Sequence, residues 1–122
     1  MSTVLLWAGV CVLGGLGSLA RFGVDSLVSS RALSRFPLGT LAVNLTGACV
    51  LGVLAGAALG HDEYLLTGTA VIGSYTTFST WQLESHRLSE DGLRRAAMLN
   101  LLLSVLLGLG AVALGRALGG LL

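Results

Sequence analysis

Residues 96–115 read AAMLNLLLSVLLGLGAVALG, twenty consecutive residues without an Asp, Glu, Lys or Arg. A helix of about 20 mostly apolar residues is long enough to cross the hydrocarbon core of a bilayer. Three further stretches lack the same four residue types: 1–20, 36–60 and 64–83. The sequence therefore predicts an all-α integral membrane protein with four transmembrane helices.

The composition excludes the other broad classes. Of the 122 residues, 54% are hydrophobic and 11% are charged, whereas soluble domains carry about 25% charged residues. A small soluble domain needs polar residues to cover its surface, and a disordered chain needs low hydrophobicity. The formal net charge of +1 gives no basic surface, so we expect no nucleic-acid partner.

We expect one transmembrane domain over the whole chain, residues 1–122. No basic residue precedes Arg21, so the first apolar stretch lacks the charged region of a signal peptide and is expected to be retained. Small residues at every fourth position, from Ala48 to Gly60, predict close helix packing. A chain this short is unlikely to enclose a pore alone, so oligomerisation is expected. The predicted spans are roughly 3–29, 37–59, 63–87 and 93–117.

Two polar side chains inside these spans need an explanation. Arg21 either has partners within the membrane or, if the first helix ends near residue 20, lies at the interface. Asn44 needs hydrogen-bond partners in its apolar helix, which a neighbouring helix or a permeating solute supplies. The sequence leaves both pairs of alternatives open.

Residues 73–80 read GSYTTFST, with five Ser and Thr side chains in the middle of the third predicted span. Such residues weaken a helix because their hydroxyls compete for backbone carbonyls. A broken helix is tolerated at membrane depth only where its backbone is buried in protein or lines a water-filled cavity. We therefore predict that the third helix is broken in mid-span, as in transporters that bind ions at such breaks.

Three motifs in this order carry a resemblance to a known family. Residues 14–22 (GGLGSLARF) look like its GGxxGAxxRY signature, and residues 37–47 (PLGTLAVNLTG) look like its P-x-GTL-x-x-N-x-x-G signature. Residues 76–84 (TTFSTWQLE) look like its TTFSTFxxE signature. With the length and the four spans, the sequence resembles the Fluc (CrcB) fluoride channels over nearly the whole chain.

The resemblance implies a fluoride-selective channel that exports fluoride passively across the cell membrane of a bacterium. It implies an antiparallel dual-topology dimer in the lipid bilayer, with a structural Na⁺ at its centre. The backbone carbonyls of Gly73 and Thr76 match the sodium ligands. Arg21 matches a structural polar residue. The positions that match the fluoride pore are Asn44, Phe78, Ser79, Thr80, Trp81, Glu84 and Ser104.

These side chains suit a small, tightly hydrated anion. Hydroxyl and amide groups are neutral donors that replace water without holding the ion too firmly, and aromatic edges carry the positive part of the ring quadrupole. Three positions depart from the family: Trp81 stands where phenylalanine is usual, Ser74 where glycine is usual and Asn100 where tyrosine is common.

The alternative function is a proton-coupled exporter of the small multidrug-resistance type. Such a protein needs a titratable carboxylate inside a span. The first acidic residue here is Asp25, and Glu84 lies near the end of the third predicted span, which argues against this alternative. No nucleophile–base pair or metal-ligand cluster is evident, so we do not expect an enzyme.

The arginines are distributed unevenly between the two ends of the predicted bundle. Basic residues near span ends favour the cytoplasmic side, so the chain is expected to prefer an orientation with its termini outside. Both a homodimer and a pairing with a homologous subunit of opposite bias remain open. The first and third loops with their flanks carry Arg31, Arg35, Arg87, Arg94 and Arg95, against Arg116 on the opposite side.

Overall fold

The computed structural model describes residues 1–122, and every regular element in it is a helix. Three of the helices, α1, α2 and α6, are long and apolar enough to cross a membrane. An all-helical membrane protein is thereby confirmed, while the third predicted span is made of several shorter pieces. The elements are α1 (Thr3–Arg31), α2 (Leu38–Gly56), α3 (His61–Tyr64), the π-helix η1 (Leu65–Ile72), α4 (Gly73–Tyr75), α5 (Ser79–Glu90) and α6 (Arg94–Gly119).

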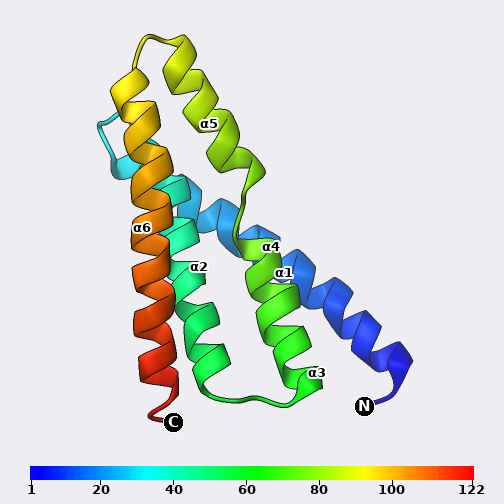
Figure 1. Cartoon of the computed structure of the whole chain (residues 1–122). Coiled ribbons are helices and arrows are strands. Elements are labelled where there is room, and N and C mark those ends of the chain that lie inside the picture. The colour runs from blue at the N-terminus through cyan, green and yellow to red at the C-terminus, as the bar shows by residue number, and fades with distance from the viewer.

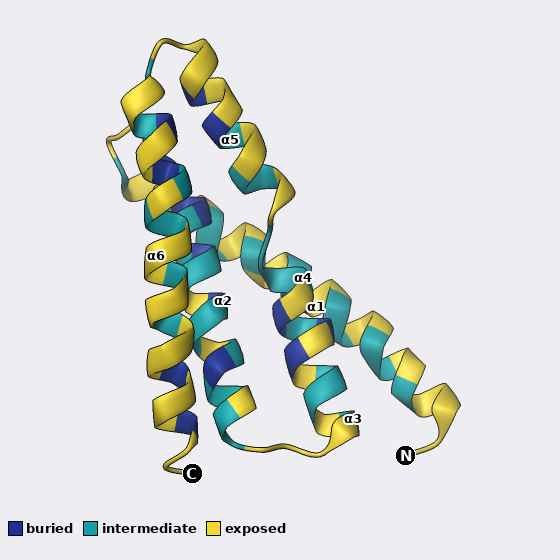
Figure 2. Ribbon diagram, in the orientation of Figure 1, coloured by how far each residue is buried: buried dark blue, intermediate teal, exposed yellow.

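The chain direction alternates along the molecule. In Figure 1, α1 and the series α3 to α5 run upward, whereas α2 and α6 run downward beside each other. The turns at 32–37 and 91–93 lie at the upper end, and both chain termini lie at the lower end with the turn at 57–60. Only 16 of the 122 residues are buried, and much of each long helix is exposed (Figure 2). Lipid chains solvate such apolar surface in a membrane.

Glycines allow α2 and α6 to pack with their backbones almost in contact. A Cβ added at Gly52 or Gly56 would collide with the backbone of α6, and one added at Gly115 or Gly119 would collide with the backbone of α2. Small residues four apart permit this close approach. The predicted stripe on α2 thus has a matching pair on α6, although Gly60 lies beyond the end of α2.

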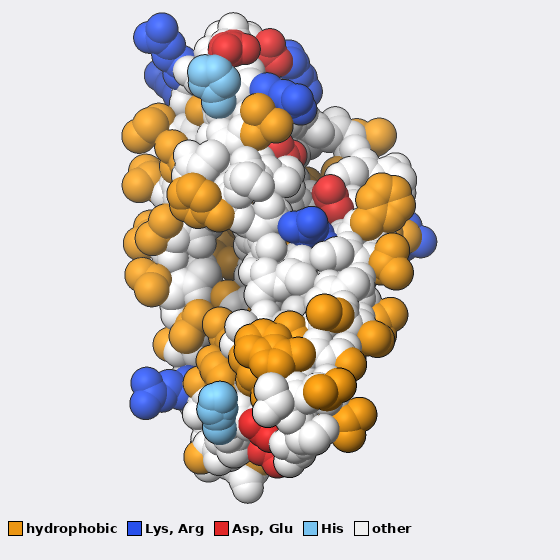
Figure 3. Space-filling view, turned by 90° about the vertical axis from the view of Figure 1, so that its right-hand side faces the viewer, with side chains coloured by type: hydrophobic (Ala, Val, Ile, Leu, Met, Phe, Trp, Pro, Cys, Tyr) orange, Lys and Arg blue, Asp and Glu red, His pale blue; other side chains and the backbone are white.

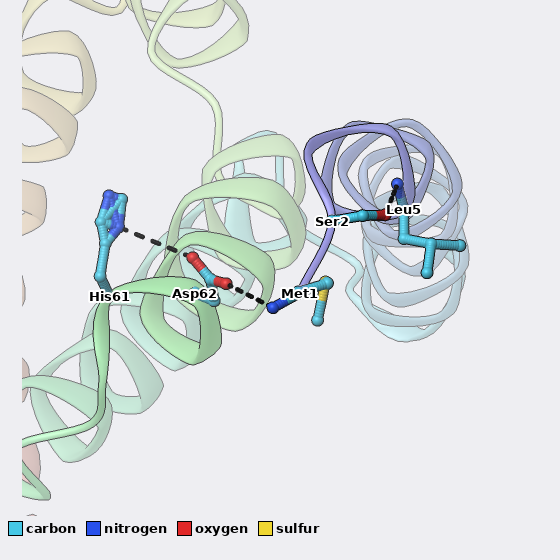
Figure 4. Close-up of polar contacts among 5 residues, drawn as sticks. All are labelled: Met1, Ser2, Leu5, His61 and Asp62. Atoms are coloured by element: carbon cyan, nitrogen blue, oxygen red, sulfur yellow. Dashed lines mark hydrogen bonds and ion pairs between the residues drawn. The ribbon is translucent and has the colours of Figure 1, made fainter.

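Polar contacts connect the elements at both ends of the bundle. Ser2 caps the N-terminus of α1, and the Met1 ammonium lies 3.9 Å from the Asp62 carboxylate at the start of α3 (Figure 4). At the other end, the Arg35 guanidinium donates a hydrogen bond of 2.6 Å to the Asp91 carboxylate, which joins the two upper turns. Both ion pairs are solvent-exposed, so each contributes at most about 1 kcal/mol to stability.

Candidate functional site

The site is organised around an interruption of the helical path at residues 76–78. Thr76 is extended, with φ −78° and ψ 160°, and Figure 1 shows a stretched strand of chain between α4 and α5. The Thr77 N–H, which a continuous helix would direct to the Gly73 carbonyl, instead bonds to Asn44. The Gly73 carbonyl therefore lacks its helical donor.

Asn44 of α2 substitutes for the missing backbone partners of Thr77. Its Nδ2 donates to the Thr77 carbonyl at 2.9 Å, and its Oδ1 accepts from the Thr77 N–H, also at 2.9 Å. A carboxamide can make this paired contact because it carries a donor and an acceptor side by side. Of the two roles open for Asn44, contact with a neighbouring segment is the one seen, and one Nδ2 hydrogen remains for another acceptor.

Arg21 of α1 reaches the same interruption from the opposite side. Its guanidinium donates to the Thr76 carbonyl at 3.5 Å, so the cation has a partner within the bundle. Gly17 permits this approach of α1, since a Cβ there would collide with η1 and α4, and Gly47 permits the approach of α2, since a Cβ there would collide with the Thr76 methyl group. Figure 3 shows one basic and one acidic group together at mid-height, apart from the basic groups at the upper end.

Two cavities flank residues 76–78. The larger has a volume of about 430 Å³ and lies between α2 and the series η1–α4, with Asn44, Gly73 and Thr76 in its wall. The smaller, of about 150 Å³, lies on the side of α1. Its wall includes the polar residues Ser18, Arg21, Asp25, Thr40, Thr77 and Thr80 beside the apolar Phe22 and Val43.

The two aromatic residues named for the pore are in contact. The Phe78 and Trp81 ring centroids are 5.5 Å apart and the ring planes meet at 76°, an edge-to-face arrangement. Phe78 is 70% exposed on the single chain. Ser79 is also exposed and forms no side-chain hydrogen bond, so the structure does not bring it together with the other candidate residues.

The hydroxyls of Thr77 and Thr80 continue from the interruption along the first turn of α5. The Thr77 hydroxyl donates to Thr80 Oγ1 at 3.2 Å and accepts from the Thr80 N–H at 3.3 Å, which caps α5. One turn further, the Glu84 carboxylate accepts a hydrogen bond from the Thr40 hydroxyl of α2. These groups form a polar line from the middle of the bundle towards its upper end.

On the α6 side, the structure reveals two residues that the sequence did not assign to the site. The Asn100 side chain is 1% exposed, and its Nδ2 donates to Ser85 Oγ at 2.8 Å. The Trp81 indole N–H donates to the Asn100 carbonyl at 3.2 Å. Ser104 Oγ is buried and has no hydrogen-bond partner. Asn100, like Asn44, is an amide side chain in an apolar helix, and this feature of the sequence could have marked it as a site residue. No feature of the sequence marks Ser85.

Comparison with known proteins gives concordant matches. Residues 8–116 match the protein-family model described as CrcB-like protein, Camphor Resistance (CrcB). The chain is 53% identical over 121 residues to the Fluoride-specific ion channel FluC 2 of Mycolicibacterium paratuberculosis, with 99% of each chain covered. It is 54% identical over 114 residues to FluC 2 of Mycobacterium tuberculosis, covering 93% of this chain and 90% of the relative. It is 46% identical over 123 residues to FluC 1 of Leifsonia xyli, covering 98% and 90%.

Proposed function

The chain belongs to the CrcB-like family, and from this membership we infer that it is a fluoride-specific ion channel. It is a multi-pass protein of the bacterial plasma membrane, with three apolar helices long enough to span the bilayer. Its relatives are named as channels rather than as enzymes or exporters, so the proton-coupled exporter is not favoured. Fluoride is the transported ion.

One observation supports this function above the others: parts of all three sequence motifs meet at residues 76–78. Arg21 belongs to the first motif and Asn44 to the second, and each bonds a carbonyl of the third. The carbonyls freed at Thr76 and Thr77 and the freed Thr77 N–H thus have defined partners, while neutral donors remain nearby. Neutral donors that bind without trapping the ion are what an anion pore requires.

We assign residues 61–90 as a fourth membrane span, broken at Thr76–Phe78. The direction of α3 to α5 in Figure 1, opposite to that of α2 and α6, supports this assignment because it places the turns at alternate ends. The smaller cavity, with Arg21, Asp25 and Thr77 in its wall, supports the position of the break, since irregular backbone within a bilayer must be buried in protein or line a water-filled cavity.

In the proposed pore, fluoride passes donors and ring edges rather than cations. The Asn44 amide, the aromatic edges of Phe78 and Trp81 and the hydroxyl groups would replace the water around the ion in turn. Glu84, bonded to Thr40, would lie at the upper end of this path. The full set is Asn44, Phe78, Ser79, Thr80, Trp81, Glu84 and Ser104.

We propose that two copies of the chain associate in antiparallel orientation. The support is the 430 Å³ cavity beside α2, together with the 70% exposure of Phe78. A second copy would cover both. The Gly73 and Thr76 carbonyls at this cavity fit a sodium ion, because hard cations prefer oxygen ligands and the Gly73 oxygen lacks its helical donor. Bound there, Na⁺ would supply a positive charge that holds carbonyls of the two copies together.

The second copy is either an identical chain or a homologous subunit. Five arginines flank the upper turns and one lies near the lower end, which favours insertion with the termini outside. An antiparallel pair needs one subunit of each orientation. A partner of opposite bias meets that need, and so does a homodimer whose packing overrides the bias.

Fluoride efflux from liposomes that contain only this protein tests the function. We expect efflux that proceeds without a pH gradient, follows the fluoride gradient and is absent when chloride replaces fluoride. Efflux that depends on a pH gradient and accepts hydrophobic cations would contradict the channel and support the exporter. If the chain alone is inactive, co-purification with a homologous subunit and recovery of fluoride efflux would support the paired assembly.

A further inference from the structure

Trp81, Ser85 and Asn100 form a closed ring of three hydrogen bonds between α5 and α6. The Trp81 indole N–H donates to the backbone carbonyl of Asn100 at 3.2 Å, and the side-chain Nδ2 of Asn100 donates to Ser85 Oγ at 2.8 Å. The Ser85 hydroxyl then donates to the Trp81 carbonyl at 2.9 Å. Asn100 and Ser85 are 1% and 5% exposed, whereas Trp81 is half-buried, so the bond between Asn100 and Ser85 is shielded from solvent and lipid.

Within the ring, the indole N–H of Trp81 is already engaged in a hydrogen bond. An indole carries a single N–H donor, and here the Asn100 carbonyl accepts it. What the Trp81 side chain can still offer to an anion is the positive edge of its ring. Phe78, which packs against it edge to face at 5.5 Å, offers the same kind of group.

The same carbonyl explains why the Ser104 hydroxyl is free. In a helix, a serine hydroxyl commonly bonds the carbonyl four residues earlier, and for Ser104 that residue is Asn100. The Trp81 indole already bonds this carbonyl, and Ser104 Oγ has no partner although it is buried. A buried hydroxyl without a partner is unfavourable, and a passing anion would supply the missing acceptor.

We propose that Ser85 and Asn100 are positioning residues that act through Trp81. The hydrogen bond between their side chains fastens α5 to α6 and so keeps the indole N–H on the Asn100 backbone carbonyl, and this level of the pore then presents a ring edge and the free Ser104 hydroxyl. An unheld indole N–H would add a strong donor to the path and retain fluoride too long, and a pore conducts only if its ion can leave. The inference rests on the proposed channel function.

The test measures fluoride flux from liposomes against fluoride concentration for Ser85→Ala and Asn100→Leu. We expect both the maximal flux and the half-saturating concentration to fall by roughly fivefold, the factor that one hydrogen bond of ordinary net strength gives. Ser89→Ala is the matched control, since Ser89 is an exposed serine one turn further along α5, and its flux should equal that of the wild type.

A second arm repeats the two substitutions in a Trp81→Phe background, which has no indole N–H. There we expect Ser85→Ala and Asn100→Leu to leave the half-saturating concentration unchanged. The inference is overturned if the half-saturating concentration does not move in the first arm, or if it moves equally in the Trp81→Phe background. Either result would mean that the two residues only stabilise the packing of α5 on α6.

Time-resolved fluorescence anisotropy supplies a measurement that is independent of flux. In a Trp7→Phe background, Trp81 is the only tryptophan, and Ser85→Ala should add a fast depolarising motion of the indole. An unchanged anisotropy decay would contradict the proposal that Ser85 holds the Trp81 indole in place. A wild-type protein without fluoride flux would contradict the proposed function instead, and the anisotropy result would still decide whether Ser85 holds Trp81.

Discussion

At the scale of single residues, Asn44 stabilises the interruption, because its side chain replaces two helical hydrogen bonds at Thr77. Asn44→Asp keeps the shape and the acceptor for the Thr77 N–H but removes the donor to the Thr77 carbonyl. We expect the protein to lose about 2–3 kcal/mol of stability, since a carboxylate would then face an unpaired carbonyl. The flux should fall more than tenfold because the new charge repels fluoride.

Thermal unfolding in detergent and liposome flux, measured on the same preparation, check this prediction. Thr46→Val serves as a control on the same helix, because the exposed Thr46 hydroxyl bonds to carbonyls of its own helix and to the Tyr75 hydroxyl but not to residues 76–78. A stability and a flux equal to the wild type in Asn44→Asp would contradict the role of Asn44.

Substitution of Phe78 should lower the fluoride flux while leaving the stability of the protomer nearly unchanged. Phe78 is 70% exposed on the single chain and packs mainly against Trp81, so Phe78→Ile should change the stability of the protomer by less than about 1 kcal/mol. The flux should fall at least tenfold, since an aliphatic side chain has no positive edge. Phe22→Ile is the matched control, as Phe22 is a phenylalanine on α1 with 73% exposure. Equal flux in both variants would mean that Phe78 only packs.

The sequence could name many of these residues but not their contacts. Arg21, Asn44 and the hydroxyl cluster are conspicuous in apolar spans, because polar groups there need partners. Their pairings join positions 55 and 33 residues apart in the chain, and no local pattern encodes such distances. Ser85 illustrates the limit: a serine near a helix end is ordinary, and only the buried Asn100 beside it makes it significant.

At the scale of elements, the packing of α2 on α6 depends on glycine. Gly115→Ala places a methyl group against the Cys49 carbonyl, and such overpacking costs about 1–3 kcal/mol. Gly110→Ala is the matched substitution on the same helix, since nothing lies within 4 Å of its added Cβ. We expect a lower thermal midpoint for Gly115→Ala and an unchanged or slightly higher one for Gly110→Ala. Equal midpoints would contradict the close contact of the two backbones.

The sequence predicts the helices that consist of long apolar stretches, but it does not predict the elements that depend on irregular hydrogen bonding. The long apolar helices α1, α2 and α6 follow from the absence of charge over about 20 residues. The cluster at 73–80 predicted a break in mid-span; residues 76–78 lie outside any helix, and the place of this break within the membrane stays a proposal. The π-helix η1 before it was not foreseen, because a shift from one helical hydrogen-bond pattern to another depends on packing and leaves no composition signal.

At the scale of the whole molecule, sodium should stabilise the assembly. We expect a higher thermal midpoint in sodium chloride than in N-methylglucamine chloride at the same ionic strength, equivalent to about 1–3 kcal/mol for a ligand that binds only the folded state. Lithium and potassium salts serve as controls for a general cation effect. Identical midpoints in all four salts would argue against a cation at the Gly73 and Thr76 carbonyls.

Orientation is the second property of the whole molecule. Reporter proteins fused to the C-terminus should mark the outside in most molecules, since five arginines flank the upper turns and one the lower end. Moving the two arginines at 94 and 95 to the lower end should make the two orientations more equal. If the wild-type reporter marks both sides equally and the chain alone forms a conducting dimer, the pairing with a second subunit is wrong.

The hydrogen bonds at Thr76 and Thr77 also bear on how the protein is made. Both donors, on Arg21 and Asn44, belong to helices that leave the ribosome before residues 61–90. As the proposed fourth membrane span, this segment would meet its partners already in the membrane and would not wait with unpaired backbone groups in lipid, which would cost several kcal/mol. In the reverse gene order, the segment would enter the bilayer without them. The order of the helices in the chain thus sets the order of assembly: the helices that carry Arg21 and Asn44 are synthesised before the segment whose backbone they bond.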